Sequence, residues 1–150
     1  MRAVIQCVRQ AKVRVDQEVI GEIGKGYLIF LGVGQEDSEE EVEKLWSKIF
    51  KLRILPDEQG KTNLSLSQVG GNALIISQFT LFADCRKGNR PNFLSAASPE
   101  KGEELYEKFL DRARKDLPNL AHGSFGANMD VELMNQGPFT LFLDTDHLRR

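Results

Sequence analysis

The first part of the chain carries a strand-like pattern of apolar residues. The segments "RAVIQCVRQAKVRVD" and "QEVIGEIGKGYLIFLGV" are rich in Val and Ile, alternate in part between apolar and polar positions, and are interrupted at Gly21, Gly24 and Gly26. β-branched residues with a period of two are typical of strands, and Gly interrupts such runs. The pattern therefore predicts strands up to Val33.

After Ser38, the spacing of the apolar residues changes from that of a strand to that of a helix. Ser38 followed by Glu41 forms a capping box, in which each side chain binds the other residue's backbone N–H. We expect an amphipathic helix from about Glu39 to Arg53. Its buried face would consist of apolar residues at helical spacing, namely Val42, Leu45, Trp46, Ile49 and Leu52.

A second helix is predicted after the segment "SPE". Ser98 is a favourable N-cap, Pro99 suits the first helical position, and Glu100 places an acid in the first turn. The apolar stripe of this helix would consist of Leu105, Tyr106, Phe109, Leu110 and Ala113.

The remaining segments predict a turn and further strands. "PDEQG" (56–60) is a turn by composition, and "NALIISQFTLF" is a strand that ends at Ala83 and Asp84. "GSFGANMDVELM" and "FTLFLDT" are two strands hinged at Gly137 and Pro138. The resulting order, βββ-α-β-β-α-β-β, contains no linker or repeat, so we expect one α+β domain over residues 1–150.

Composition narrows the class of protein. With 150 residues, 41% hydrophobic and 28% charged, the chain is typical of a globular domain. The longest apolar run, Tyr27 to Val33, is far shorter than the roughly 20 residues of a membrane span. Because the N-terminus also lacks the apolar core of a signal peptide, we expect a cytoplasmic protein with no membrane partner. Cys7 and Cys85 form neither a metal-ligand spacing nor a disulfide framework.

Charge limits the nucleic acids that the protein can bind. A net charge of −2 argues against a protein that wraps a long nucleic acid, but it leaves a short RNA end open. One basic cluster, "RKGNR" from Arg86 to Arg90, is either a solvated loop or a phosphate site.

The common catalytic motifs are missing. His122 and His147 have no adjacent nucleophile with an orienting acid, and no metal-binding or nucleotide-binding motif occurs. We therefore expect neither a metal nor a cofactor. Two polar features remain: "SQFT" (77–80) either satisfies neighbouring backbone groups or lines a pocket, and Gly137-Pro138 is either a simple turn or a rigid segment that presents its carbonyls.

These features together resemble one known family. The blocks "MRAVIQCV", "IGKGYLIFLGV", "LRILPDEQGKTNLSL", "SQFTLFAD", "KGNRPNF", "LYEKF", "FGANMDVELMNQGPFT" and "LDT" are similar, in this order, to those of the D-aminoacyl-tRNA deacylases. The resemblance runs from Met1 to about Thr145. Its two signatures, an SQxxL-type strand at 77–81 and an NxGPxT segment at 135–140, are highly specific as a pair.

The resemblance implies an architecture and a set of site residues. It implies a homodimer of barrel-like, strand-rich antiparallel or mixed sheets with two main helices, in which a cis Gly-Pro segment of one subunit enters the partner's site. The implied catalytic residues are Ser77, Gln78, Phe79 and Thr80, and the implied chiral-selection residues are Gly137 and Pro138. The implied substrate-binding residues are Phe125, Ala127, Met129, Asn135 and Thr140, and the implied tRNA-binding residues are Lys87 and Arg90.

The expected reaction is hydrolysis of the ester bond of D-aminoacyl-tRNA and of glycyl-tRNA mischarged on tRNA(Ala). Backbone N–H groups around Gln78 and Phe79 would form an oxyanion hole, and Thr80 would be a supporting residue because it has no adjacent base. Two alternatives remain open: a related deacylase of mischarged L-aminoacyl-tRNA, and a non-catalytic module that binds the aminoacylated tRNA 3′ end. The chain departs from the family at Cys7, where Arg is usual, at Phe139, where Val is commoner, and at Leu55-Pro56.

Overall fold

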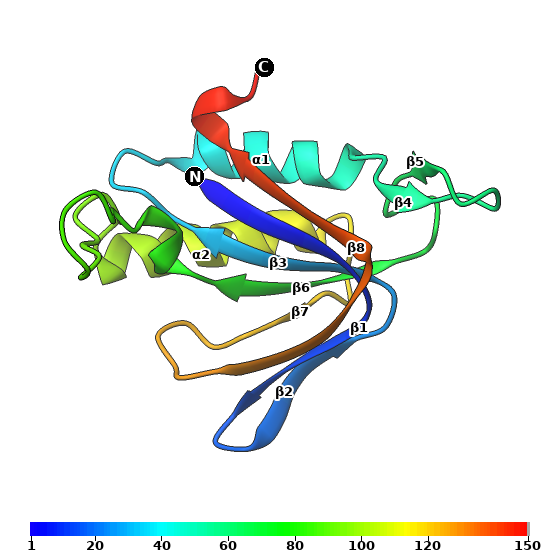
Figure 1. The fold of residues 1–150 in the computed structure, drawn as a ribbon, viewed down its shortest axis with the longest axis horizontal. Coiled ribbons are helices and arrows are strands. Elements are labelled where there is room, and N and C mark those ends of the chain that lie inside the picture. The colour runs from blue at the N-terminus through cyan, green and yellow to red at the C-terminus, as the bar shows by residue number, and fades with distance from the viewer. Residues whose placement is uncertain (150) are drawn as a thin grey trace.

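A computed structural model describes residues 1–149 and shows two helices packed on one face of a mixed sheet that is nearly closed into a barrel (Figure 1). The strand order is β2-β1-β3-β6-β7, and β8 pairs with β1. The strands of this sheet are β1 (Arg2–Val15), β2 (Glu18–Ile23), β3 (Gly26–Gly32), β6 (Asn72–Ser77), β7 (Ala121–His122) and β8 (Asp130–Asp144). The predicted α+β class is confirmed.

Strand β1 connects two apolar clusters. Its first half pairs with β3 and its second half with β2, while β8 runs antiparallel to both halves. Ala3, Ile5 and Cys7 are buried in the cluster under the helices. Val8 and Val13 are buried in the other cluster, inside the curled part of the sheet. Cys7 and Val8 face opposite sides, as successive strand residues do. The alternation is interrupted after Val8, where Arg9 and Gln10 are both exposed and the register with β8 shifts, so Ala11 and Val13 return to the same cluster as Val8.

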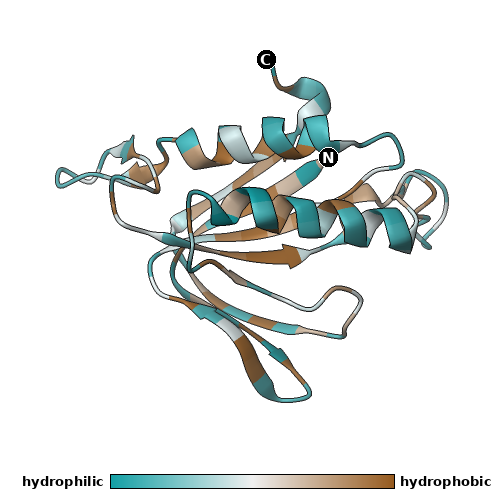
Figure 2. Cartoon of the chain, turned by 180° about the vertical axis from the view of Figure 1, so that it is seen from behind, coloured by the Kyte–Doolittle hydropathy of each residue, from teal (hydrophilic) through white to brown (hydrophobic). Residues whose placement is uncertain are grey.

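The two predicted helices are confirmed. Helix α1 (Glu39–Lys51) begins at the capping box of Ser38 and Glu41 and ends two residues before the predicted Arg53. Helix α2 (Pro99–Arg114) begins after Ser98 and buries the predicted stripe. Figure 2 shows the apolar sides of both helices turned toward the sheet and their polar sides turned outward.

The helices also contact each other. The indole ring of Trp46 packs edge-on against Phe109, with ring centroids 5.7 Å apart. The indole N–H of Trp46 donates to Asp116 Oδ2 at 2.8 Å. A partly buried indole N–H is thereby satisfied, and the pair anchors the chain just after α2 to α1.

The region around Thr80 corrects one prediction. Strand β6 ends at Ser77 rather than at Ala83, and Phe79–Phe82 form a short 3₁₀ helix, η1. Apolar residues continue beyond Ser77, so the strand pattern alone does not reveal the end of the strand. The chain turns because Leu81 N–H donates to Gln78 O at 3.2 Å, a local bond that replaces the ladder.

The C-terminal region corrects a second prediction. The two strands expected around Gly137 and Pro138 are one long strand, β8, which carries the Gly-Pro segment as a bulge. The turn predicted at 56–60 is confirmed, since it joins β4 (Leu55–Pro56) to β5 (Thr62–Leu64). In the described part of the chain, no helix is both long enough and apolar enough to cross a membrane.

Candidate active site

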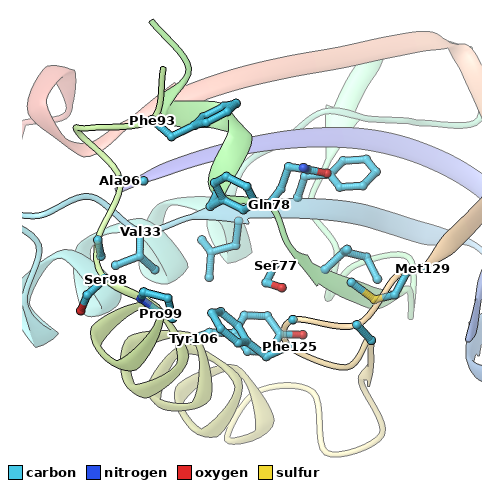
Figure 3. A pocket seen from close by; sticks show the side chains of 18 of the residues that line it. Val33, Ser77, Gln78, Phe93, Ala96, Ser98, Pro99, Tyr106, Phe125 and Met129 are labelled. Atoms are coloured by element: carbon cyan, nitrogen blue, oxygen red, sulfur yellow. The ribbon is translucent and has the colours of Figure 1, made fainter. Parts of the chain in front are cut away.

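A pocket of about 590 Å³ opens where β6 ends, between η1 and the start of α2 (Figure 3). It contains six of the predicted site residues: Ser77, Gln78, Phe79, Phe125, Ala127 and Met129. The other lining residues are Phe30, Leu31, Val33, Ile76, Phe93, Ala96, Ala97, Ser98, Pro99, Gly102, Tyr106, Gly126 and Val131. Residues of the first signature and of the segment around Phe125 thus form one largely apolar cavity, whereas Thr80 and the second signature (135–140) are not among its lining residues.

The turn from β6 into η1 leaves two backbone donors free. Gln78 N–H donates to Leu31 O at 2.7 Å and continues the β6–β3 ladder for one residue. Within the part of the chain that the structure describes, the next two amides, those of Phe79 and Thr80, have no acceptor. The first N–H groups of any helix lack partners within the helix. The oxyanion hole expected around Gln78 and Phe79 would therefore consist of the amides of Phe79 and Thr80.

Side chains at the pocket mouth are paired with each other. Gln78 Nε2 donates to Thr80 Oγ1. The ring of Phe79, which is 57% exposed, packs edge-on against Phe93 with centroids 5.0 Å apart. The Thr80 hydroxyl therefore contacts an amide rather than a base, which agrees with a supporting role for Thr80.

Helix α2 supports the opposite wall. Tyr106 OH donates to Ile75 O at 2.7 Å, and burial raises the pKa of Tyr106, so the phenol stays protonated at neutral pH. The ring of Phe125 packs against Tyr106, with centroids 5.9 Å apart. Gly102 allows this approach, because a Cβ there would lie 3.3 Å from Phe125 Cζ.

The pocket walls contain no evident base. Tyr106 is the only titratable side chain among its lining residues, and its hydroxyl is already bonded. No group of three or more His, Cys, Asp or Glu side chains suited to a metal ion occurs in the described residues. The polar groups that face the cavity are therefore hydroxyl, amide and backbone groups.

The Gly-Pro segment is a bulge in β8. On one side of the bulge Gln6 pairs with Thr140, and on the other Val8 pairs with Asn135. Five residue steps of β8 thus lie opposite two steps of β1, and three extra residues of β8 protrude. A second irregularity follows, where two steps of β1 from Val8 to Gln10 lie opposite one step of β8. The bond between Gly137 and Pro138 is cis, and Gly137 has φ +126°, which favours glycine.

Side chains of the same signature brace the bulge. Asn135 Oδ1 accepts the Phe139 N–H at 2.9 Å, and Asn135 Nδ2 donates to Thr140 Oγ1 at 2.9 Å. Gln6 Nε2 donates to Thr140 Oγ1 at 3.2 Å from the neighbouring strand. The structure therefore gives Asn135 and Thr140 contacts within the bulge, while their predicted contact with substrate stays a prediction.

The bulge lies far from the pocket of its own subunit. Cys7, which is opposite the bulge, pairs with Tyr27, and Tyr27 pairs with Ala73, four residues before Ser77. Four residue steps and three strand spacings correspond to roughly 20 Å along the sheet. Gly137 and Pro138 do not line the pocket described above.

The basic loop after η1 presents two free cations. Arg86 is ion-paired with Asp84 at 2.7 Å, and hydrogen bonds from Arg86 lower the pKa of Asp84. Lys87 and Arg90 are exposed and have no ion pair within residues 1–149. The loop turns at Gly88, whose φ is +65°. Charge is therefore available where tRNA contact is predicted.

Sequence reasoning missed several lining residues. Phe93 lies between the basic cluster and the predicted second helix and was given no role, and Tyr106 was predicted only as part of a buried stripe. The aromatic character of both residues was the available signal, because aromatic side chains commonly line ligand pockets.

Comparison with known proteins places the chain in a family. The family model described as D-Tyr-tRNA(Tyr) deacylase matches residues 4–144. A protein of Clostridium acetobutylicum named D-aminoacyl-tRNA deacylase is 50% identical over 145 residues, 97% of each chain. One of the same name from Dictyoglomus turgidum is 49% identical over 150 residues, which covers 100% of this chain and 96% of the relative.

Solved structures show the same fold. The structure described as "c-Myc DNA Unwinding Element Binding Protein" has a TM-score of 0.91 and 39% identity, and the match covers 96% of this chain and 98% of that one. A "probable eukaryotic D-amino acid tRNA deacylase" has a TM-score of 0.85 at 16% identity over 95% and 97% of the two chains, a likeness of fold alone. The family match and the identity over nearly the full length establish that the chain belongs to the D-Tyr-tRNA(Tyr) deacylase family.

Proposed function

We propose that the protein hydrolyses the ester bond between a D-amino acid and the 3′-terminal ribose of tRNA. By family it is a hydrolase of the D-aminoacyl-tRNA deacylase class. The observation that carries the proposal is the pair of free amides of Phe79, which lines the apolar pocket, and of Thr80, the next residue in the chain. Two such donors are suited to the negative charge that develops on an ester carbonyl under attack.

The reaction needs little further from the protein. An aminoacyl ester is already activated, so holding the ester and a water in the correct geometry supplies much of the rate. Ser77 and Gln78 would orient the ester next to the oxyanion hole. Because no base lines the pocket, the free ribose hydroxyl next to the ester would relay the proton: it would accept a proton from the attacking water and pass its own proton to the leaving ribose oxygen, so that free tRNA and the amino acid are released.

Chiral selection would come from the bulge of a second subunit. Gly137 and Pro138 do not line the pocket of their own protomer, and they lie roughly 20 Å from Ser77 along the sheet, so we infer that they act on a substrate bound by a second protomer. Strand β8 has no partner on its second edge within residues 1–149, and its Met134 and Phe142 are 50% and 57% exposed. An unpaired edge with exposed apolar residues suits an interface between two copies.

Rejection of L-amino acids by the backbone carbonyls of the Gly-Pro segment would explain the expected range of substrates. Two carbonyls held close to the substrate Cα would collide with an L side chain and tolerate a D side chain or a hydrogen. Glycine on tRNA(Ala) would therefore be accepted together with many D-amino acids. A tRNA substrate also accords with the cytoplasmic location predicted from the sequence.

Cys7 supports one alternative activity, the removal of mischarged L-amino acids. Arg is usual in the family at this position and, by resemblance, holds the carbonyls of the Gly-Pro segment. Cys7 is 2% exposed and its thiol lies 3.8 Å from Ile54 O, so its side chain is directed into the core. Without a long donor at residue 7, the bulge depends on its own bracing by Asn135, Thr140 and Gln6.

The test is a deacylation assay with D-Tyr-tRNA, L-Tyr-tRNA and Gly-tRNA(Ala). We expect release of free tRNA from the first and third substrates and not from the second. Rapid hydrolysis of L-Tyr-tRNA would identify the alternative deacylase, and tRNA binding without any release would identify a binding module. Sedimentation at micromolar concentration tests the shared site, because a fully active monomer contradicts it.

A further inference from the structure

Arg2, at the start of β1, joins three parts of the molecule. Its Nη1 donates to Leu81 O at 2.8 Å, so it binds the turn η1 directly. Its Nε lies 3.0 Å from Asp144 Oδ2, at the end of β8. The guanidinium carbon also lies 4.3 Å from the centre of the Phe82 ring, which is within cation–π range.

Asp144, which binds the Arg2 guanidinium, is itself held in place by burial and by a hydrogen bond. Asp144 is 8% exposed, and its second oxygen accepts the Asp146 N–H at 3.0 Å. Burial alone would raise the pKa of Asp144, but these hydrogen bonds from Asp146 and Arg2 outweigh it and lower the pKa. The carboxylate is therefore charged at neutral pH and holds the Arg2 fork in one orientation.

Close-packed backbone beside Arg2 also supports η1, since Gly32 is the cross-strand partner of Arg2. At Gly32 a Cβ would lie 3.0 Å from Gln78 O and 3.1 Å from Leu81 Cβ. At Gly34 a Cβ would lie 2.8 Å from the Phe82 ring. The turn thus rests on the backbone at Gly32 and Gly34 and on the Arg2 guanidinium, and only the guanidinium belongs to a side chain.

We propose that Arg2 is a positioning residue for the deacylation reaction, fixing η1 so that the Phe79 and Thr80 amides point at the reacting ester. The inference rests on the proposed function of those amides. Arg2 contacts the carbonyl of Leu81, one residue after Thr80, so a shift of the guanidinium moves the oxyanion hole directly. Neither Arg2 nor Asp144 lines the pocket, so the effect would fall on the rate of the chemical step and not on substrate affinity.

The test compares Arg2→Ala, Arg2→Lys and Arg14→Ala in turnover of D-Tyr-tRNA, with kcat and KM measured separately. Arg14 is the matched control, because it is on the same strand, has the same 31% side-chain exposure and is ion-paired with Glu132 at 3.2 Å, away from η1. For Arg2→Ala we expect kcat to fall about 30- to 100-fold, the cost of a small misplacement of catalytic groups, with KM within about threefold. Arg14→Ala should leave both parameters unchanged.

The conservative variant separates positioning from folding. Lys at position 2 keeps the charge and one donor but not the planar fork, so Arg2→Lys should recover part of the lost kcat. Comparable thermal midpoints for Arg2→Ala and Arg14→Ala, with an unchanged preference for D over L, complete the expected pattern. If Arg2→Ala does not fold, the kcat of Arg2→Lys tests the positioning role instead.

Three outcomes overturn the inference. One is a kcat of Arg2→Ala within about threefold of wild type while the wild type is active, since a positioning role predicts a larger loss. Another is a folded Arg2→Lys with full wild-type kcat when Arg2→Ala is unfolded. A wild-type protein that releases no D-amino acid overturns the proposed function and this inference together.

Discussion

The pocket and the Gly-Pro bulge differ in how completely one chain builds them. The pocket is formed by β6, η1, α2 and the segment around Phe125, and each wall is held by contacts inside the same protomer. The bulge is braced by Asn135 and Thr140, but Gly137 and Pro138 are exposed. The pocket is a cavity formed within one protomer, whereas the bulge is an exposed protrusion with a defined conformation.

Under the proposed function, the two regions have separate tasks. Changes in the bulge should alter which substrates are accepted, and changes around η1 should alter how fast an accepted substrate reacts. If both kinds of change gave the same pattern of effects, the two regions would not be the separate parts of one shared site.

The largest effect is expected from Gly137→Ala. The residue adopts φ +126°, and a Cβ would lie 3.1 Å from Phe139 N, so the bulge must move. We expect kcat/KM for D-Tyr-tRNA to fall about 100-fold, because a displacement of about 1 Å suffices for such a loss. Steady-state kinetics checks this value. The neighbouring Gln136→Ala is the control and should have little effect; equal losses for both would contradict the special role of Gly137.

A smaller effect is expected from Asn135→Ala, which removes both hydrogen bonds that span the bulge. At about 1 kcal/mol for each of the two bonds, we expect roughly a thirtyfold loss of turnover and a lower D-over-L ratio. Gln6→Ala removes only the single bond to Thr140 and should show less of both. Parallel assays with D-Tyr-tRNA and L-Tyr-tRNA measure the ratio, and an unchanged ratio would separate the bulge from chiral selection.

The basic loop should affect tRNA affinity alone. Replacing Lys87 and Arg90 by Ala should lower the slope of log affinity against log salt by about one unit for each lost phosphate contact. Titration at several salt concentrations measures that slope. Arg86→Ala is the informative comparison, because Arg86 is already paired with Asp84 and should change the slope less. A collapse of the D-over-L ratio with unchanged affinity would place the loop in the chiral pocket instead.

The smallest effect is expected from Thr80→Ala. The Thr80 hydroxyl contacts Gln78 Nε2 and no base, whereas its amide, which the substitution retains, belongs to the proposed oxyanion hole. Most of the activity should therefore remain. A loss of more than about a thousandfold in single-turnover rate with the fold intact, or an acyl group trapped on Thr80, would show that Thr80 is the nucleophile.

The sequence predicted the helices well because their signals are local. The capping box at Ser38 and the Ser98-Pro99 start depend on neighbours within one turn, and both are present as expected. The end of β6 was mispredicted because the residues after Ser77 remain apolar, and the bond from Gln78 N–H to Leu31 O, which gives the last ladder contact, joins distant segments. Strand β7 was missed for the same reason, since two residues carry no pattern and exist only by pairing with β6.

The candidate site was only partly predictable. Both signatures were found from their residues, but their separation depends on the pairing of β8 with β1, of β1 with β3 and of β3 with β6. No single-sequence pattern encodes that register. Arg2 was overlooked because its role depends on Leu81 and Asp144, which are far from it in the chain.

Between the pairs Gln6–Thr140 and Gln10–Met134, the register of β1 and β8 is offset by a net two residues, because three extra residues of β8 are partly offset by one extra residue of β1. Two is the period of a strand. A net odd offset would turn the side chains after the bulge to the other face, whereas an even offset lets Leu141 and Leu143 pack against the core under the helices while Val131 and Leu133 pack against the other apolar cluster. The exposed Gly-Pro segment can therefore protrude without any loss of apolar contacts on either side of it, and a change in its length would preserve those contacts only in steps of two residues.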